Sequence, residues 1–386
     1  MRLETTAGAL RSALDVLGRV VPKASAVPLM QSVQFDGATA RATDLNNYVE
    51  VDLAVTRAEG KASILHRPLA ALVRHIDRDD TITLEAGAQG VTLRFSGGRY
   101  DLPTVEGDDL RMSGAFFKPM ALDGAAFKKG MRFCLPFVCD EETRYYLNGI
   151  CLADGHMVST NGHRMAVYPV AELAGETCAP IISRTSLALL SKLPDPSRIF
   201  TGRDEQPVMR FDMPGVRITS KLIDGTYPDW RRVVPEISAD CHCLTLDRRA
   251  LLKVVRRVSA ALNATGGLRG VALAYNQQSI ALGGASDHGL MAREYLSDVA
   301  ISGVAADAHI EFNSTYLASV LEAFPAEVRV SMFVRDAGSV SLFRCSQDGP
   351  FTLLMPQRAG SRGLDLANEA LREWSQPASA TEKQVA

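Results

Sequence analysis

Asp154, Ser159 and His163 combine, within one short stretch, the side-chain types of a hydrolytic triad. In such a triad a histidine base removes the proton of a serine hydroxyl, which then attacks the substrate. No nucleophile elbow, paired-carboxylate motif, phosphate loop or metal-binding motif accompanies these residues. The Thr-Asn-Gly-His-Arg run that contains His163 is typical of a turn followed by a strand. We therefore expect no catalytic residues, no cofactor and no enzymatic activity.

Cysteine usage argues against both a metal centre and a disulfide framework. Cys241 and Cys243 flank His242, but two thiols without a second ligand pair indicate strand or loop residues more than a zinc site. The seven cysteines are irregularly spaced, which suits reduced thiols in a cytosol. No apolar run is long enough to cross a bilayer, and the N-terminus lacks a signal-peptide pattern. We therefore expect a cytoplasmic protein without a metal site.

The segment 247–262 carries a cationic stripe whose chemistry is electrostatic binding. Apolar side chains fall on one side of a helical wheel, and these are Leu251, Val254, Val255, Val258 and Leu262. Cations fall on the opposite side, and these are Arg249, Lys253, Arg256 and Arg257. Because like charges on one face without interleaved acids repel one another, the stripe indicates an anionic partner.

Two other segments carry weaker versions of this stripe. The cations in the middle of the chain are Lys128, Lys129 and Arg132. Near the N-terminus they are Arg11 and Arg19, with Asp15 between them, and a solvated helix face is the simpler interpretation of that segment alone. Three stripes in a chain with a net charge of −2 indicate one basic surface that binds a phosphate backbone. Base-specific recognition is not expected, because no zinc-finger, leucine-zipper or RNA-binding signature is present.

Three similar modules are expected to position these stripes. Each module has two helices, and the six helices are expected to begin near Ala7, His66, Leu122, Ser183, Leu246 and Asn313. Short β-branched or aromatic segments between turn residues predict antiparallel hairpins at 81–84, 91–95, 208–211, 216–219, 328–333 and 340–343. The expected fold class is α+β, with two helices packed on antiparallel sheets in each module.

Length and composition fit this division. The chain has 386 residues, of which 46% are hydrophobic and 22% are charged, as in an ordinary globular protein. Domains of about 100 to 200 residues would divide it into two to four parts. We place the modules at 1–114, 115–240 and 241–358, followed by an extension at 359–386.

Six sequence runs occur in an order that is typical of one family. They are RYYLNG (144–149), STNGHRMAV (159–167), TSKLIDGTYPDWRRVVP (219–235), LRGVAL (268–273), FNSTYL (312–317) and LLMPQR (353–358). Together they resemble the bacterial DNA polymerase III β subunit, the replication sliding clamp, over about residues 1–358. The resemblance implies three repeated DNA-clamp domains that form half of a six-domain ring. The ring would be a head-to-tail homodimer around double-stranded DNA, with the basic helices on its inner wall.

The resemblance also implies two sets of contact residues. The DNA-binding set is Lys128, Lys129, Arg132, Tyr145, Tyr146, Arg249, Lys253, Arg256 and Arg257. For both tyrosines, packing within a strand is the alternative interpretation. The dimer-interface set is Tyr100, Leu102, Leu262 and Asn263.

A hydrophobic pocket between the second and third modules would bind peptides of the polymerase and of the clamp loader. The implied pocket residues are Leu147, Thr160, Gly162, His163, Arg164, Met165, Pro228, Arg232, Val233, Asn313, Tyr316, Ser339, Leu353, Leu354, Met355 and Pro356. Apolar walls with a few polar anchors suit a short linear peptide. The implied function is that of a processivity factor that tethers a DNA polymerase catalytic subunit and is assembled by an ATP-driven loader. The alternative is a clamp-fold paralogue that acts on DNA as a scaffold or decoy without closing a ring.

The chain departs from the family pattern at several positions. Leu268 stands where the family often has an aromatic residue, and Gln357 stands where an apolar residue is common. Asn263 occupies a position that is usually apolar in the dimer interface, so ring closure is implied less firmly than the fold.

Residues 359–386 continue beyond the usual end of family chains. Apolar residues recur there at helical spacing, at Leu364, Ala367, Leu371 and Trp374. This spacing predicts one short amphipathic helix before a polar, disordered end. Leu364-Asp365-Leu366 resembles the centre of the peptides that occupy the clamp pocket, but it lacks their flanking Gln and terminal aromatic residue. One hypothesis is that the tail competes for the pocket, and a chance tripeptide on an ordinary helix is the alternative.

Overall fold

The computed structural model describes residues 1–87, 90–110, 112, 115–175, 179–264, 270–303, 308–357 and 361–375. The chain divides into two compact units. Unit 1 consists of Met1–Lys129 and Pro180–Gly225, and unit 2 consists of Gly130–Ala179 and Thr226–Ala386. Helix α3 (Gly124–Cys134) contains one point of division. The division into three modules stays a prediction, and Leu268 and residues 376–386 lie outside the described residues.

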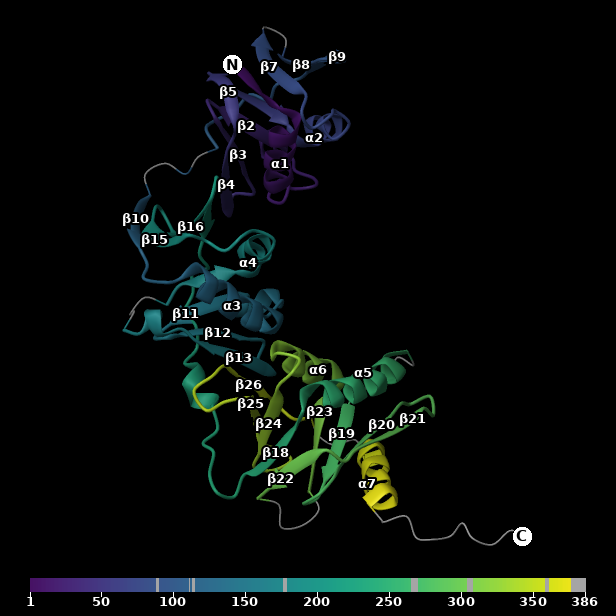
Figure 1. The fold of residues 1–386 in the computed structure, drawn as a ribbon. Coiled ribbons are helices and arrows are strands. Elements are labelled where there is room, and N and C mark those ends of the chain that lie inside the picture. The colour runs from purple at the N-terminus through teal and green to yellow at the C-terminus, as the bar shows by residue number, and fades with distance from the viewer. Residues whose placement is uncertain are drawn as a thin grey trace, which may run out of the picture. The chain divides into compact units, whose positions relative to one another are not determined.

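Unit 1 contains two antiparallel sheets, with strand orders β5-β1-β7-β8-β9 and β10-β15-β16-β17-β4-β3-β2-β6 (Figure 1). Its strands are β1 (Arg2–Thr6), β2 (Ser32–Asp36), β3 (Thr39–Thr43), β4 (Asn47–Asp52), β5 (Val55–Glu59), β6 (Lys61–Leu65), β7 (Thr81–Gly87), β8 (Gly90–Phe95), β9 (Gly98–Leu102), β10 (Phe116–Pro119), β14 (Ile181–Ser183), β15 (Arg198–Arg203), β16 (Pro207–Met213) and β17 (Val216–Lys221). Its helices are α1 (Ala7–Leu17), α2 (His66–Val73), α4 (Arg184–Ser191) and the 3-10 helix η1 (Pro28–Gln31).

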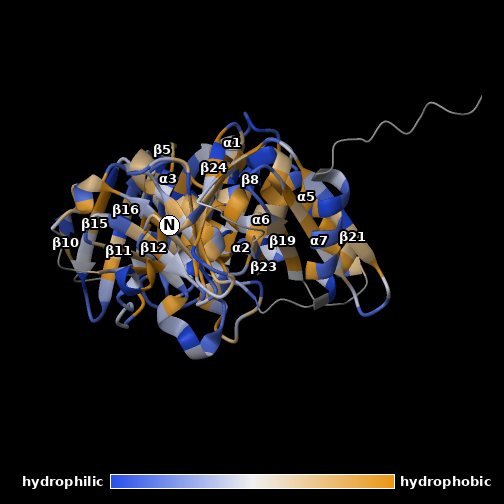
Figure 2. Cartoon of the chain, turned by 90° about the horizontal axis from the view of Figure 1, so that it is seen from below, coloured by the Kyte–Doolittle hydropathy of each residue, from blue (hydrophilic) through white to orange (hydrophobic). Residues whose placement is uncertain are grey.

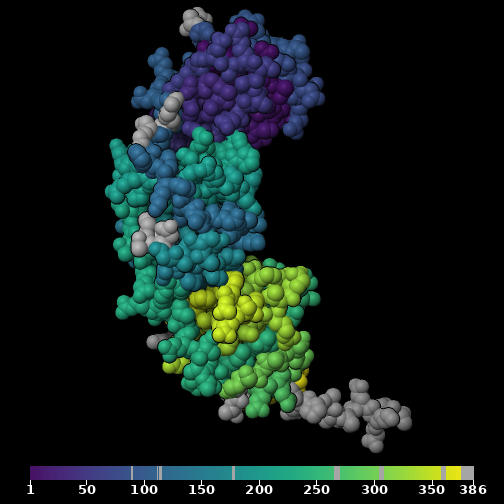
Figure 3. Space-filling view, turned by 60° about the vertical axis from the view of Figure 1, so that its left-hand side comes forward, coloured from purple at the N-terminus to yellow at the C-terminus, as the bar shows by residue number. Residues whose placement is uncertain are grey.

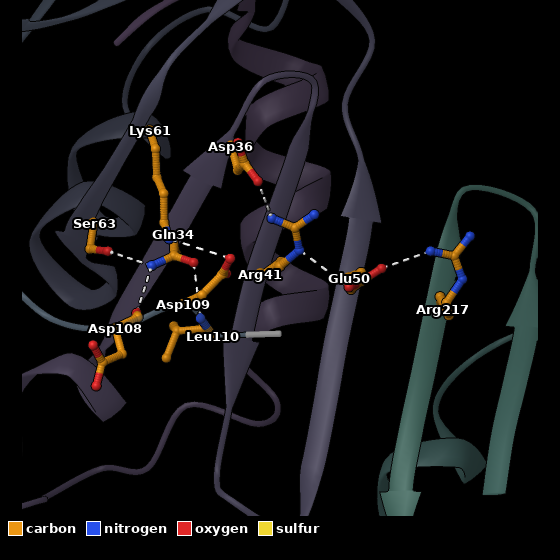
Figure 4. Close-up of polar contacts among 10 residues, drawn as sticks. All are labelled: Gln34, Asp36, Arg41, Glu50, Lys61, Ser63, Asp108, Asp109, Leu110 and Arg217. Atoms are coloured by element: carbon orange, nitrogen blue, oxygen red, sulfur yellow. Dashed lines mark hydrogen bonds and ion pairs between the residues drawn. The ribbon is translucent and has the colours of Figure 1, made fainter. Parts of the chain in front are cut away.

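A row of charged contacts joins β3, β4 and β17 within one sheet of unit 1 (Figure 4). Arg41 on β3 donates to Glu50 on β4 at 3.2 Å, and Arg217 on β17 donates to the other Glu50 oxygen at 2.7 Å. Gln34 on β2 accepts a hydrogen bond from the Leu110 amide at 3.0 Å, which fastens the segment after β9 to the same sheet. The charge-assisted bond between Arg217 and Glu50 reinforces the backbone pairing of β4 with β17.

Unit 2 also contains two antiparallel sheets, with strand orders β11-β12-β13-β26-β25-β24-β18-β22 and β21-β20-β19-β23. Its strands are β11 (Gly149–Ala153), β12 (His156–Thr160), β13 (Arg164–Pro169), β18 (His242–Asp247), β19 (Gly270–Tyr275), β20 (Ile280–Ala285), β21 (Met291–Leu296), β22 (Val299–Ser302), β23 (Ala308–Asn313), β24 (Arg329–Val334), β25 (Ser341–Arg344) and β26 (Phe351–Leu354). Its helices are α5 (Arg248–Ala264), α6 (Ser314–Ala323), α7 (Ser361–Ser375) and the 3-10 helices η2 (Leu135–Phe137), η3 (Glu142–Leu147), η4 (Ala171–Leu173) and η5 (Trp230–Val233).

Side-chain caps fix where most of the helices begin. An oxygen of the residue before or near the first turn accepts an amide hydrogen bond, and these residues are Thr6 for α1, Asp123 for α3, Ser183 for α4, Asp247 for α5 and Asn313 for α6. All six helices begin within two residues of the predicted positions. The predicted hairpins form as β7–β8, β16–β17 and β24–β25. The α+β fold class is confirmed, with α5 and α6 packed side by side on the sheets of unit 2.

No helix among the described residues is both long and apolar enough to span a membrane. The predicted helix in the C-terminal extension is present as α7. It packs on β19, β20 and β21, which form most of the smaller sheet of unit 2.

Candidate functional site

An apolar pocket of about 210 Å³ lies in unit 2, where β13 pairs with β26. Met165 on β13 and Leu353 on β26 are register partners, and they share a core cluster with Trp230. The amide of Met355 donates to the carbonyl oxygen of His163 at 2.8 Å, which holds the turn before β13 against the end of β26. In Figure 3 the surface of residues near 350, in yellow, adjoins the blue-green surface of residues near 140–170.

The size and lining of the pocket suit the anchoring side chains of a peptide. Cavities that enclose a drug-sized ligand typically have volumes of about 300–1,000 Å³. The volume of this pocket is too small to enclose such a molecule. Its lining residues are Leu147, Thr160, Gly162, His163, Arg164, Met165, Pro228, Asp229, Trp230, Val233, Val340, Leu353 and Met355. Aliphatic, aromatic and methionine side chains predominate, and methionine adapts its shape to different partners.

Arg164 stabilises one wall of the pocket. Its guanidinium lies over the rings of Tyr316 and Phe137, with its central carbon 4.7 and 5.1 Å from the two ring centroids. It also donates to the Pro136 carbonyl at 2.8 Å and to the Ser319 hydroxyl. Burial lowers the pKa of Arg164 from its ordinary value, although nearby Tyr316 opposes that shift.

Ten of the sixteen implied pocket residues line this cavity. Arg232, Asn313, Tyr316, Ser339, Leu354 and Pro356 do not line it. Tyr316 nevertheless supports it, because its ring stacks on His163 with centroids 5.9 Å apart. Asn313 caps α6, and Leu354 is fully buried in β26. Asp229, Trp230 and Val340 were missed, although the first two lie inside the run 219–235 that carries the family resemblance.

The basic face of α5 is exposed as predicted. The five residues of the predicted apolar side are buried, whereas Arg249, Lys253, Arg256 and Arg257 are exposed. These four cations, with Arg248, Leu252 and Ala260, line an open groove of about 530 Å³.

Acidic residues from other elements neutralise part of this face, which the helix sequence alone does not show. Glu327 lies 2.5 Å from Arg249, Glu322 lies 2.8 Å from Arg256, and Glu294 lies 2.6 Å from Arg257. The expectation of a face without acidic partners is therefore wrong for these three arginines. Lys253 makes no ion pair with any residue that the structure describes.

Lys128 is not on an exposed face, so its placement among the outward-facing cations is wrong. Its side chain is 1% exposed, and its ammonium donates to the carbonyls of Leu190 and Leu193 at 2.6 and 2.7 Å. These carbonyls lie at the end of α4, where the helix dipole favours a cation. Lys129 and Arg132 are exposed on α3.

Helices α1 and α5, which are each the first helix of a predicted module, use a cation in the same way. Arg11 on α1 donates to the carbonyls of Val73, Arg74 and Ile76 at the end of α2, at 3.0, 2.9 and 2.8 Å. Arg248 on α5 donates to the Leu321 carbonyl near the end of α6 at 2.8 Å. Part of the basic charge on α1, α3 and α5 thus stabilises the fold by adding a charged donor to carbonyls at or near the ends of α2, α4 and α6, where the regular helical hydrogen bonds run out.

Tyr145 and Tyr146 belong to η3 and not to a strand, so the alternative of packing within a strand is wrong. Tyr145 is 54% exposed, and its ring contacts that of Tyr146 edge to face with centroids 5.8 Å apart. An exposed ring of this kind is available for stacking or for contact with a sugar-phosphate backbone.

The implied dimer-interface residues occupy different surroundings. Tyr100 and Leu102 lie on β9, an edge strand of its sheet, and Tyr100 is 48% exposed. Asn263 is exposed near the end of α5, whereas Leu262 is fully buried. Leu262 therefore cannot present its side chain to a second copy, which corrects its assignment to the interface.

The residues of the possible hydrolytic triad do not form one. Ser159 is buried, and its hydroxyl donates to the Cys134 carbonyl at 2.6 Å. Asp154 pairs with Arg231 at 2.5 Å, and His163 stacks on Tyr316 as described above. Around Cys241 and Cys243, His242 lies 3.0 Å from the Tyr275 hydroxyl. No cluster of metal-ligating side chains occurs within the part of the chain that the structure describes.

Fold and site together define an α+β protein with a basic helix and an apolar peptide-sized pocket. Models of the DNA polymerase III beta subunit match residues 124–229 as its central domain and residues 231–358 as its C-terminal domain. The chain belongs to this family.

Individual relatives agree with that assignment. The beta sliding clamp of Caulobacter vibrioides strain NA1000 is 27% identical over 350 residues, which cover 83% of this chain and 90% of the relative. The beta sliding clamp of Escherichia coli K12 is 25% identical over 336 residues, covering 82% and 86%. A crystal structure of the Caulobacter crescentus beta sliding clamp matches with a TM-score of 0.82 and 24% identity, covering 93% of this chain and all of that one. This last likeness shows the fold.

Proposed function

We propose that the chain is a non-catalytic DNA sliding clamp, a processivity factor that encircles duplex DNA as a homodimeric ring. The observation that carries the proposal is the exposed basic face of α5 in a member of the DNA polymerase III β family. Lys129, Arg132 and Tyr145 add exposed cations and an exposed ring from the central part of the chain.

The chemistry of the α5 face suits a duplex that must move. Lys and Arg attract phosphates at any base sequence, and long-range attraction keeps the duplex near the basic surface. Because phosphate contacts carry no sequence information, no single register of the DNA is strongly favoured. Retention then depends on the closed ring and not on tight binding.

The pocket on β13 and β26 supplies the tethering site. A short apolar peptide from a DNA polymerase catalytic subunit would place one or two side chains against Met165, Leu353 and Trp230. The same pocket would receive the ATP-driven loader that opens and closes the ring. Shared use is reasonable, since a mainly apolar pocket with flexible methionines tolerates different peptides.

Two edge strands offer a way for copies to associate. In the described structure β9 is at one edge of its sheet in unit 1, and β21 is at one edge of the smaller sheet in unit 2. Unpaired strand edges are templates for pairing with another chain. A head-to-tail dimer would pair β9 of one copy with β21 of the other, and a second such contact would close the ring.

Retention on circular and linear DNA tests the proposal. The chain, loaded by its cognate loader onto a nicked circle, should remain bound during gel filtration in about 0.5 M salt, where simple phosphate binding is weak. Linearising the circle should release it, because the ring slides off the ends. Equal loss from circular and linear DNA would contradict the clamp function. A monomeric mass in solution together with that loss would support the non-ring scaffold instead.

A further inference from the structure

Helix α7 is docked on the smaller sheet of unit 2, as Figures 1 and 2 both show beside β21. Its inward residues Ala367, Ala370 and Leu371 form a buried cluster with Ala272 and Ala281 of the sheet. Leu366 is also buried, at 2% exposure. The Leu364-Asp365-Leu366 tripeptide is therefore part of this interface, and the docked helix does not present it to the pocket.

A glycine on β20, Gly283, leaves the space in which α7 packs closely against the sheet. A Cβ atom on Gly283 would collide with the Gly363 carbonyl oxygen and lie 2.5 Å from the Ala367 amide nitrogen. The next residue, Gly284, faces Val258 and Leu262 of α5. Since successive residues of a strand point to opposite faces, α5 and α7 cover the two faces of the same sheet.

The edge strand β21 is fastened by ion pairs to both helices. Glu294 receives Arg257 of α5 at 2.6 Å. Its neighbour Arg293 lies 3.3 Å from Glu369 and 3.5 Å from Glu373, both on α7. Adjacent residues of β21 are thus held from opposite faces, which restricts movement of the edge.

Exposed apolar groups lie along the same edge. Trp374 of α7 is 46% exposed and contacts Tyr295 of β21 edge to face, with ring centroids 5.7 Å apart. Met291, at the start of β21, is 53% exposed, and its sulfur contacts the Arg362 guanidinium at 3.2 Å. Apolar groups that remain exposed beside the outer edge of β21, which pairs there with no strand that the structure describes, suit a protein partner.

We propose that α7 is a brace for the subunit interface: it holds β21 in a pairing-ready conformation and adds Trp374 to the surface that receives a second copy of this chain. The occupant of that surface is the β9 edge of the second copy, so this inference rests on the homodimer of the proposed function. Strand β9 is five residues long against six for β21, and it carries the exposed Tyr100 as an apolar counterpart. Preorganising the edge lowers the ordering cost of association.

Dimer dissociation of matched variants tests the brace. Sedimentation of the full chain would be compared with a chain that ends at Gln357, with Gly283→Val, which should undock α7, and with Glu369→Gln/Glu373→Gln, which keeps α7 but removes its ion pairs to Arg293. We expect dissociation constants raised about tenfold or more for the first two variants and about threefold for the third. Arg372→Gln, an exposed change on α7, is the control and should leave dissociation unchanged.

Hydrogen exchange gives a readout that simple misfolding would not reproduce. In the Glu369→Gln/Glu373→Gln variant, the amides of β21 should exchange faster while those of β24 and β26 stay protected. Unchanged dissociation constants in all three variants, with a dimeric parent chain, would overturn the brace and leave the clamp function intact. A parent chain that stays monomeric would instead refute both the brace and the homodimer. Higher affinity for a pocket peptide after removal of residues 358–386, without a change in dissociation, would support competition by the tail and contradict the brace.

Discussion

Lys128 and Lys129 are neighbours on α3, yet one ammonium is buried at the end of α4 and the other is in solvent. The difference arises because successive residues of a helix point in directions about 100° apart. Only Lys128 can reach the carbonyls of Leu190 and Leu193. The two residues therefore separate the contribution of charge to stability from its contribution to DNA binding.

Replacing Lys128 with Met should lower the free energy of unfolding by about 2 kcal/mol, since it removes a charged donor from two buried carbonyls, and the Leu190 carbonyl then keeps only the Leu193 amide. Lys129→Met should change stability by less than about 0.5 kcal/mol, while lowering the salt dependence of DNA binding by about one charge. Urea denaturation and fluorescence anisotropy with a duplex would measure the two effects. Equal stability of the two variants would contradict the capping role of Lys128.

Glu322 and Glu327 should weaken the attraction of α5 for DNA, because a phosphate must displace them from Arg256 and Arg249. The double variant Glu322→Gln/Glu327→Gln should bind duplex DNA about threefold to tenfold more tightly at low salt. The control Glu59→Gln removes one negative charge from β5, where Glu59 pairs with Arg57. A gain in binding free energy per removed charge as large for the control as for the double variant would show that only net charge matters.

At the residue scale, helical periodicity placed the buried and exposed sides of α5 correctly. It could not separate Lys128 from Lys129, because the partners of Lys128 lie 62 and 65 residues further along the chain. It also missed the acids opposite α5, which come from β21, α6 and the segment after α6. Side-chain partners that are distant in sequence have no local signature.

At the element scale, the pocket depends on the pairing of β13 with β26 and on η5 beside it. Trp230 of η5 packs against Phe351 and under Arg231, so its indole is held in place from two sides. Its indole nitrogen has no hydrogen-bond partner among the described residues. Within the described structure, Trp230 therefore contributes to the pocket through the apolar area of its ring and not through a hydrogen bond.

Trp230→Ala should reduce the affinity of a synthetic Leu-Asp-Leu peptide, with a flanking Gln and a terminal aromatic residue, by about thirtyfold. Trp230→Phe should cost less than about fivefold, because the lost indole nitrogen bonds to no residue that the structure describes and most of the ring remains. Isothermal titration calorimetry would measure both. Circular dichroism would check that Trp230→Ala stays folded, and a large loss with Trp230→Phe would mean that the indole N–H bonds to the peptide.

Strand identity was readable from the sequence, but several strand pairings were not. The hairpins β7–β8, β16–β17 and β24–β25 join neighbouring segments, so turn residues predict them. The pairing of Met165 with Leu353, and of Val49 with Ile218, joins segments that are more than 150 residues apart. Only the family resemblance indicated that the segments of Met165 and Leu353 lie together. Ten of the pocket residues that the resemblance implies line the cavity.

At the scale of the whole molecule, the proposed clamp should be indifferent to base sequence. Affinity for an A·T-only duplex and a G·C-only duplex of equal length should agree within about twofold, since contacts to phosphates position without reading bases. Fluorescence anisotropy at matched salt would measure both affinities. A preference of more than about tenfold would indicate base readout, which contradicts a freely sliding ring.

The paired arginines of α5 also bear on how smoothly such a ring would travel. An unpaired guanidinium would gain a whole ion pair at each phosphate and lose it again at the next step. The interaction energy would then rise and fall strongly along the duplex. Within the proposed ring, Arg249, Arg256 and Arg257 would instead exchange a carboxylate for a phosphate and back, so each step would change the energy only by the difference between two oxyanions. Friction along the duplex would thereby be reduced.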